Sequence, residues 1–254
     1  MATQKYYSTK RDYERKQKKR LPFQCIRKVV TKIFDKLEVT WDEPMQEGEP
    51  AVFVVNHAKA YGPLAMSTNF DVPMRPWVIY NVCYTKTFPA FSRQDFWHPQ
   101  NFFTKGCVWI ISYLLAPLAS YIFSGMEAIP AYFDKRAVIT IQKSMETLLE
   151  GKSVVIFPEN RTPYSVYNED FSQGFLYLGK RYYRKTKKCL KFYPVYVCKQ
   201  QKTMQIGRPI AYDPSQNFNE YKLAMKDYLR DEMTHLASRR NCPPQYGLGE
   251  IKPH

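Results

Sequence analysis

The residues best suited to chemistry in this chain are Asn56 and His57, which directly follow a hydrophobic run at 51–55. An imidazole exchanges a proton near neutral pH, so His57 is a candidate general base toward a hydroxyl group, an effect worth about 10²–10⁴-fold in rate. A single histidine is also commonly structural or exposed, and Asn56 is also a common turn residue. Gly62 and Pro63 indicate that the chain turns sharply after the run.

A second hydrophobic run, at 153–157, also ends in polar residues. Glu159 is a candidate for binding a polar acceptor, and Arg161 is a candidate for holding a phosphate group through paired hydrogen bonds. Each of these residues taken alone is also typical of a solvated turn or surface. The remaining candidates for substrate binding are Asn160, Lys59, Tyr61 and Arg136.

Both sets of polar residues lie where the strands of an α/β sheet build active sites, at the carboxyl ends. A short strand at 129–132, a helix at 136–149 and the strand at 153–157 predict a parallel pair with a right-handed crossover. A further strand is predicted at 190–197, where Pro194 favours the edge of the sheet. The sequence therefore predicts an α/β fold in which helices wrap a mostly parallel sheet.

The N-terminal region precedes this predicted fold. Residues 1–20 form a basic arm that we expect to be flexible, and residues 21–37 have the pattern of an amphipathic helix. Such a helix fits either the protein core or the surface of an anionic bilayer. We expect a single domain over 21–240 and a flexible tail at 241–254.

One segment, 105–127, contains no charged residue between Lys105 and Glu127. It is long enough to span a bilayer, which needs about 20 residues. Pro117 and several hydroxyl-bearing side chains favour a buried or membrane-dipping helical hairpin over a true span.

The composition narrows the possible partners. The 254 residues are rich in aromatic side chains, which argues against disorder, and carry a formal net charge of +15. That charge favours an anionic partner: a membrane surface, phosphates or nucleic acid. No nucleic-acid-binding motif is present, so nucleic acid is the weakest of the three. The six cysteines form no C-x-x-C pair, so we expect reduced thiols, no metal site and a cytosolic compartment.

In order and spacing, these motifs resemble those of the glycerolipid acyltransferase family, whose members acylate glycerol-3-phosphate or lysophosphatidic acid. Asn56 and His57 match the start of the family motif N-H-x4-D, and Gly62 occupies the position of its aspartate. Pro194 lies in an apolar strand, as in the fourth motif of the family. The resemblance covers roughly 25–210 and is closest to a divergent bacterial branch.

The other two motifs match in part. Residues 157–159 match the start of F-P-E-G-x-R, but Asn160 replaces the glycine and Arg161 comes one residue early. Residues 129–130 match the strand of the second motif, whose arginine is absent, although 134–136 place an aspartate, a lysine and an arginine slightly beyond it.

The resemblance implies a membrane-associated enzyme on the cytoplasmic face, peripheral or monotopic, with a membrane-docking helical region before its sheet. Its partners would be an anionic membrane surface and a lysophospholipid or glycerol-phosphate-like acceptor. An acyl thioester of coenzyme A or of acyl carrier protein would be the co-substrate, with no cofactor bound. His57 would deprotonate the acceptor hydroxyl, and Glu159 would help to bind the acceptor.

The departure at Gly62 opens an alternative. Neutralising the aspartate of another histidine–aspartate system costs about 10⁴ in kcat, and a glycine cannot hold an imidazole. Tyr61, Asp95, Asp134 or a backbone carbonyl are the candidate substitutes. Without one, either His57 would work alone as the base or the chain would be a non-catalytic homologue that binds lipid.

Overall fold

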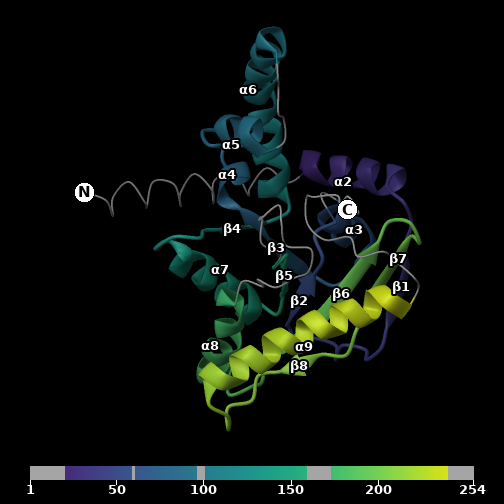
Figure 1. Cartoon of the computed structure of the whole chain (residues 1–254), viewed down its shortest axis with the longest axis vertical. Helices are drawn as coiled ribbons and strands as arrows, with labels where there is room; N and C mark the ends of the chain where they lie inside the picture. The colour runs from purple at the N-terminus through teal and green to yellow at the C-terminus, as the bar shows by residue number, and fades with distance from the viewer. Residues whose placement is uncertain (1–20, 59–60, 96–100, 159–172, 240–254) are drawn as a thin grey trace, which may run out of the picture. The chain divides into compact units, whose positions relative to one another are not determined.

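A computed structural model of the chain describes residues 21–58, 61–95, 101–158 and 173–239 (Figure 1). The predicted basic arm at 1–20 and the predicted tail at 241–254 lie outside these residues. The fold is α/β, as predicted. The sheet has the strand order β1-β7-β6-β2-β5-β3-β4, and β8 pairs with β6. The strands are β1 Glu38–Trp41, β2 Ala51–Val55, β3 Met74–Ile79, β4 Ile129–Ala131, β5 Ser153–Ile156, β6 Lys191–Cys198, β7 Thr203–Ile206 and β8 Ile210–Ala211.

Helices occupy most of the remaining described chain. They are α2 Leu21–Ile33, α3 Tyr61–Asn69, α4 Tyr80–Cys83, α5 Phe88–Asp95, α6 Phe102–Gly125, α7 Ala137–Leu149, α8 Tyr177–Thr186 and α9 Phe218–Arg239, with a short 3-10 turn at Gly174–Leu176. Internal contacts divide the chain into two compact units. Unit 1 comprises Met1–Val29 and Pro76–Thr140, and unit 2 comprises Val30–Arg75 and Ile141–His254.

The centre of unit 2 is β2, whose five residues are all buried. β2 pairs in parallel with β5 on one side and with β6 on the other, so that Val54 lies opposite both Ile156 and Pro194. Such a strand is covered on both faces, which explains why its sequence is apolar throughout rather than alternating. The two polar-ended strands of the sequence are therefore neighbours, and they finish at the same edge of the sheet.

Two predictions about strand positions are wrong. The strands at 129–132 and 153–157 do not pair with each other, because β3 lies between them in the strand order. β6 is an interior strand despite Pro194. Its pairing with β8 ends at Phe192 and its pairing with β7 begins at Val195, so the missing N–H of Pro194 falls in the gap between these partners.

Unit 1 contains the long apolar segment. The predicted hairpin is wrong: α6 is one continuous helix of 24 residues with Pro117 inside it. The proline is exposed, so its ring does not enter the packed side of the helix. On that side Ala116 joins Val82, Phe88 and Phe91 in a core that α4, α5 and α6 build together.

One cysteine also differs from expectation. Cys198 is disulfide-bonded, whereas we expected reduced thiols throughout. Cys25, Cys83, Cys107 and Cys189 are free. Spacing along the sequence identifies only local cysteine pairs, so it gave no sign of a bond at this position.

Candidate functional site

The turn after β2 is anchored by Asn56, whose side chain is buried. Its Nδ2 donates to the Val197 carbonyl at 3.0 Å, and its Oδ1 accepts from the Val197 N–H at 2.7 Å. The side-chain amide of Asn56 thus takes the place of a backbone peptide group in the hydrogen bonding between β2 and β6. It fixes the point at which the chain leaves the sheet. These contacts make Asn56 a positioning residue, and its predicted contact with substrate stays a prediction.

His57 lies at the edge where β2 and β5 both end. Its half-buried ring meets the ring of Phe157, the first residue after β5, with 5.3 Å between centroids and an edge-on angle of 62°. In the sequence Phe157 is only a motif match, and nothing in the pattern reveals this role of its ring. Lys59, Glu159, Asn160 and Arg161, which were predicted to bind substrate, lie outside the described residues.

Gly62 closes the turn by approaching the backbone of Asn56 and His57, just after β2. Its N–H donates to the His57 carbonyl at 3.1 Å, and the preceding N–H of Tyr61 donates to the Ala58 carbonyl at 3.1 Å. Ala58 itself has a left-handed φ of 43°. A Cβ at position 62 would collide with the Asn56 carbonyl oxygen and lie 2.8 Å from that of His57. The turn therefore has no room for an aspartate at this position.

Tyr61 points away from solvent, into unit 2. Its ring packs on Phe34 with 4.9 Å between centroids. Its buried hydroxyl lies beside the Asp35 carboxylate, without a hydrogen bond of normal geometry to any described residue. Burial, followed by the charge of Asp35, raises the pKa of Tyr61 to about 12. Tyr61 is therefore a proton donor rather than a base at neutral pH.

Asp35 is itself paired with Lys202, whose Nζ lies 2.8 Å from the carboxylate. A hydrogen bond from Lys202 is the main cause that lowers the pKa of Asp35. A second lysine, Lys199, lies 5.8 Å from the centroid of the Tyr61 ring. This charged cluster could not be predicted from the sequence, because Asp35 and the two lysines are far apart along the chain.

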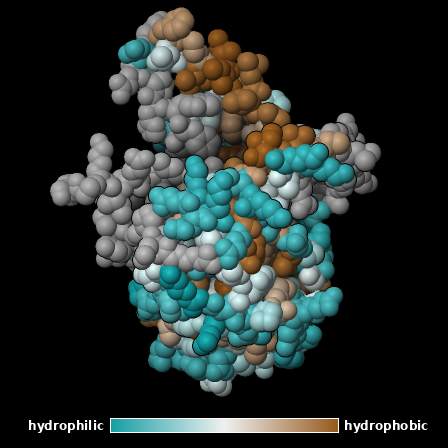
Figure 2. Space-filling view, turned by 90° about the vertical axis from the view of Figure 1, so that its right-hand side faces the viewer, coloured by the Kyte–Doolittle hydropathy of each residue, from teal (hydrophilic) through white to brown (hydrophobic). Residues whose placement is uncertain are grey.

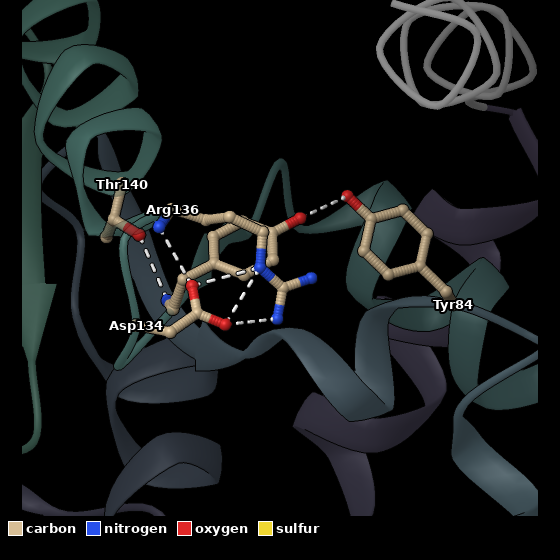
Figure 3. Close-up of polar contacts among 5 residues, drawn as sticks. Tyr84, Asp134, Arg136 and Thr140 are labelled. Atoms are coloured by element: carbon tan, nitrogen blue, oxygen red, sulfur yellow. Dashed lines mark hydrogen bonds and ion pairs between the residues drawn. The ribbon is translucent and has the colours of Figure 1, made fainter. Parts of the chain in front are cut away.

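In unit 1, Arg136 is held by the carboxylate of Asp134, as Figure 3 shows, and by the rings of Tyr80 and Tyr132. The carboxylate of Asp134 accepts from the guanidinium at 2.6–3.0 Å and from the backbone N–H of Arg136 at 2.8 Å. The guanidinium carbon lies 4.5 Å from the centroid of Tyr80 and 4.6 Å from that of Tyr132. These contacts fix Arg136 just before α7, and its predicted contact with a phosphate stays a prediction.

Asp134 was a candidate to replace the missing aspartate of the first motif. The Arg136 hydrogen bonds lower its pKa to about 2, which marks a carboxylate committed to an existing partner. The other carboxylate candidate was Asp95, whose side chain lies outside the described part of the chain. Among the described residues, no group of three or more His, Cys, Asp or Glu side chains is arranged to hold a metal ion.

Hydroxyl groups complete the Arg136 region in Figure 3. The Thr140 hydroxyl donates to the Pro130 carbonyl at 2.8 Å and accepts from the Tyr132 N–H at 3.1 Å, which ties β4 to α7. The hydroxyls of Tyr84 and Tyr132 lie 3.3 Å apart. These contacts fix the backbone on both sides of Arg136 and the Tyr132 ring against which it packs.

Comparison with known proteins adds no assignment: the chain matches no family model and no curated protein. The resemblance to glycerolipid acyltransferases therefore rests on the sequence motifs alone.

Proposed function

We propose that this protein is a membrane-associated O-acyltransferase. It moves a fatty acyl group from a coenzyme A or acyl-carrier-protein thioester to a hydroxyl of a lysophospholipid or glycerol-phosphate-like acceptor. It works at an anionic membrane surface on the cytoplasmic side. The observation that carries the proposal is the placement of His57 where two parallel strands end together, with its ring against Phe157.

In the proposed reaction, His57 takes the proton from the acceptor hydroxyl. The oxygen then forms an ester bond with the thioester carbonyl carbon, the carbon–sulfur bond breaks, and the departing thiolate takes the proton from the imidazolium. General-base assistance of this kind contributes about 10²–10⁴-fold. The pairing of Asn56 with Val197 supports the proposal, because it holds the backbone that carries the imidazole.

A second candidate function is lipid binding without catalysis. One observation favours it: the close backbone contact of Gly62 excludes the aspartate that would stabilise an imidazolium. This candidate predicts binding of lipid vesicles without turnover.

The deciding experiment follows consumption of an acyl thioester with a panel of lysolipids and other alcohols. We expect turnover in the native chain and a loss of about 10²-fold or more in His57→Ala. His235→Ala is the matched control, because His235 is an exposed histidine of α9. Turnover that His57→Ala leaves unchanged would refute the mechanism, and binding with no turnover on any acceptor would favour the second candidate.

A further inference from the structure

The polarity of α6 is reversed relative to a helix that faces water. Its buried side consists of small and hydroxyl-bearing residues, with Ser112, Ala116 and Ser120 all at most 3 % exposed. Its outward side is apolar, and Leu114 on that side is 71 % exposed. A water-soluble helix buries its apolar stripe and exposes its polar one.

Two serines on the buried side are already hydrogen-bonded within unit 1. The Ser112 hydroxyl donates to the Trp109 carbonyl at 2.7 Å and accepts from Arg93 of α5 at 2.9 Å. The Ser120 hydroxyl donates to the Cys83 carbonyl of α4 at 3.0 Å. These bonds tie the buried side of α6 to α4 and α5, and they fix the orientation of the helix.

The outward side forms a continuous apolar surface, which we call the outer stripe. It is visible as the hydrophobic column along α6 in Figure 2. The exposed large residues that define the outer stripe are Phe103, Ile110, Ile111, Leu114, Leu115 and Leu118. From Phe103 to Leu118 the outer stripe extends about 22 Å at ~1.5 Å per residue. An exposed apolar surface of this length is rare on a monomeric soluble protein and marks a contact site.

The charges of the chain identify the occupant of this surface. Lys105 lies seven residues, or about two turns, before Ser112, so it is on the same side of the helix as Ser112 and away from the outer stripe. The outer stripe therefore carries no charged residue. A second copy of this chain would bring another +15 of net charge toward the first, whereas an anionic bilayer attracts that charge. The rings of Trp109 and Tyr113 pack together beside the stripe at 4.8 Å between centroids, and aromatic side chains of these two types gather at membrane interfaces.

We propose that the outer stripe of α6 docks into the acyl region of an anionic phospholipid bilayer while the serine side of the helix stays packed on α4 and α5. The helix then enters the membrane by one face and does not cross it as an isolated span. This inference concerns the partner surface and holds whether or not the protein transfers acyl groups.

The test is co-sedimentation of the full-length protein with vesicles of equal parts phosphatidylcholine and phosphatidylglycerol. The test variant carries Ile110→Gln, Leu114→Gln and Leu118→Gln, all at exposed positions, so folding is preserved and circular dichroism verifies it. We expect at least ~100-fold weaker binding, because each lost aliphatic side chain weakens transfer into lipid by about tenfold. The matched control is Leu149→Gln with Leu223→Gln, two exposed leucines outside α6, and it should bind like the native chain.

The proposal would be overturned if the α6 variant bound vesicles as tightly as the native chain does. Absence of vesicle binding by the native chain would also overturn it. The proposal would equally fail if analytical ultracentrifugation showed a stable dimer of the native chain and only monomer for the α6 variant, because the stripe would then be a dimer interface. The thioester assay separates this test from the proposed activity. If the α6 variant binds vesicles weakly and the native chain shows no turnover, the proposed docking surface is supported. Only the proposed acyltransferase activity is then rejected.

Discussion

The substitution Gly62→Asp, which would restore the aspartate of the family motif, is expected to damage the protein rather than activate it. The new Cβ would collide with the Asn56 carbonyl oxygen and lie 2.8 Å from that of His57. Both obstacles are backbone atoms of the two residues that follow β2, a strand held on both sides by β5 and β6. They cannot swing aside as the tip of a flexible side chain would.

The magnitude follows from two contributions. Overpacking of this kind costs about 1–3 kcal/mol. Displacing the turn also loses the hydrogen bond from the Gly62 N–H to the His57 carbonyl, worth about 0.5–1.5 kcal/mol. Together they lower the free energy of unfolding by about 2–4 kcal/mol, which in a chain of this size lowers Tm by about 5–15 °C.

The assay pairs Tm from circular dichroism with kcat/KM for thioester consumption. Gly62→Ala is measured beside Gly62→Asp, and the two should lose similar stability, because the Cβ rather than the carboxylate is responsible. Gly174→Ala is the control, since a Cβ there meets nothing within 4 Å. A Gly62→Asp protein with native Tm and a raised kcat/KM would refute the reasoning, because it would mean that the turn reshapes and rebuilds the dyad.

Three further substitutions probe the candidate residues. Asn56→Ala should lower the free energy of unfolding by about 2–4 kcal/mol in urea titrations, because it strands the buried N–H and carbonyl of Val197; a change below 1 kcal/mol, on the order of one ordinary hydrogen bond, would contradict the anchoring role. Tyr61 has a folded pKa of about 12 against an ordinary 10.0, so its contribution is complete below pH 10 and is lost as the pH rises toward 12. Tyr61→Phe should therefore make Tm fall less steeply over that window, and an unchanged slope would argue against burial of the hydroxyl. The pKa of Asp134 is lowered to about 2 from 3.8, so its contribution is present above pH 4 and is lost as the pH falls through that range. Asp134→Asn should flatten the acid limb of Tm against pH, and an identical limb would show that its pairing with Arg136 does not stabilise the fold.

The centre of the fold could be predicted from the sequence because β2 and β5 are short apolar runs with clear ends. Their polar ends and the break at Gly62 are local signals, and they suffice to locate the turn at His57. The family motif, however, suggests only that the aspartate of the motif has been lost at Gly62. Only the three-dimensional approach of the backbone shows that this turn requires a glycine.

The failures share a physical cause: they depend on contacts far away in the chain. Pro194 is tolerated in an interior strand because β7 and β8 leave a gap beside it, and no local pattern reveals that gap. Pro117 and the serines of α6 looked like interruptions of a helix, yet the serines are on its packed side. The sequence shows that α6 has a polar side and an apolar side. Which of the two sides is buried depends on where α4 and α5 pack.

The position of β2 at the centre of the sheet also sets the order in which the molecule can be assembled during synthesis. The bond from the Ala51 N–H to Ser153 spans 102 residues, and the pairing of Asn56 with Val197 spans 141. By contrast, the contact of Arg93 with Ser112 spans only 19 residues. Contacts that close long loops form late, so the apolar helix α6 is complete while β2 still lacks both of its neighbours. A ribosome delivering this chain therefore presents the outer stripe of α6 well before Asn56 can anchor the turn at His57 to β6.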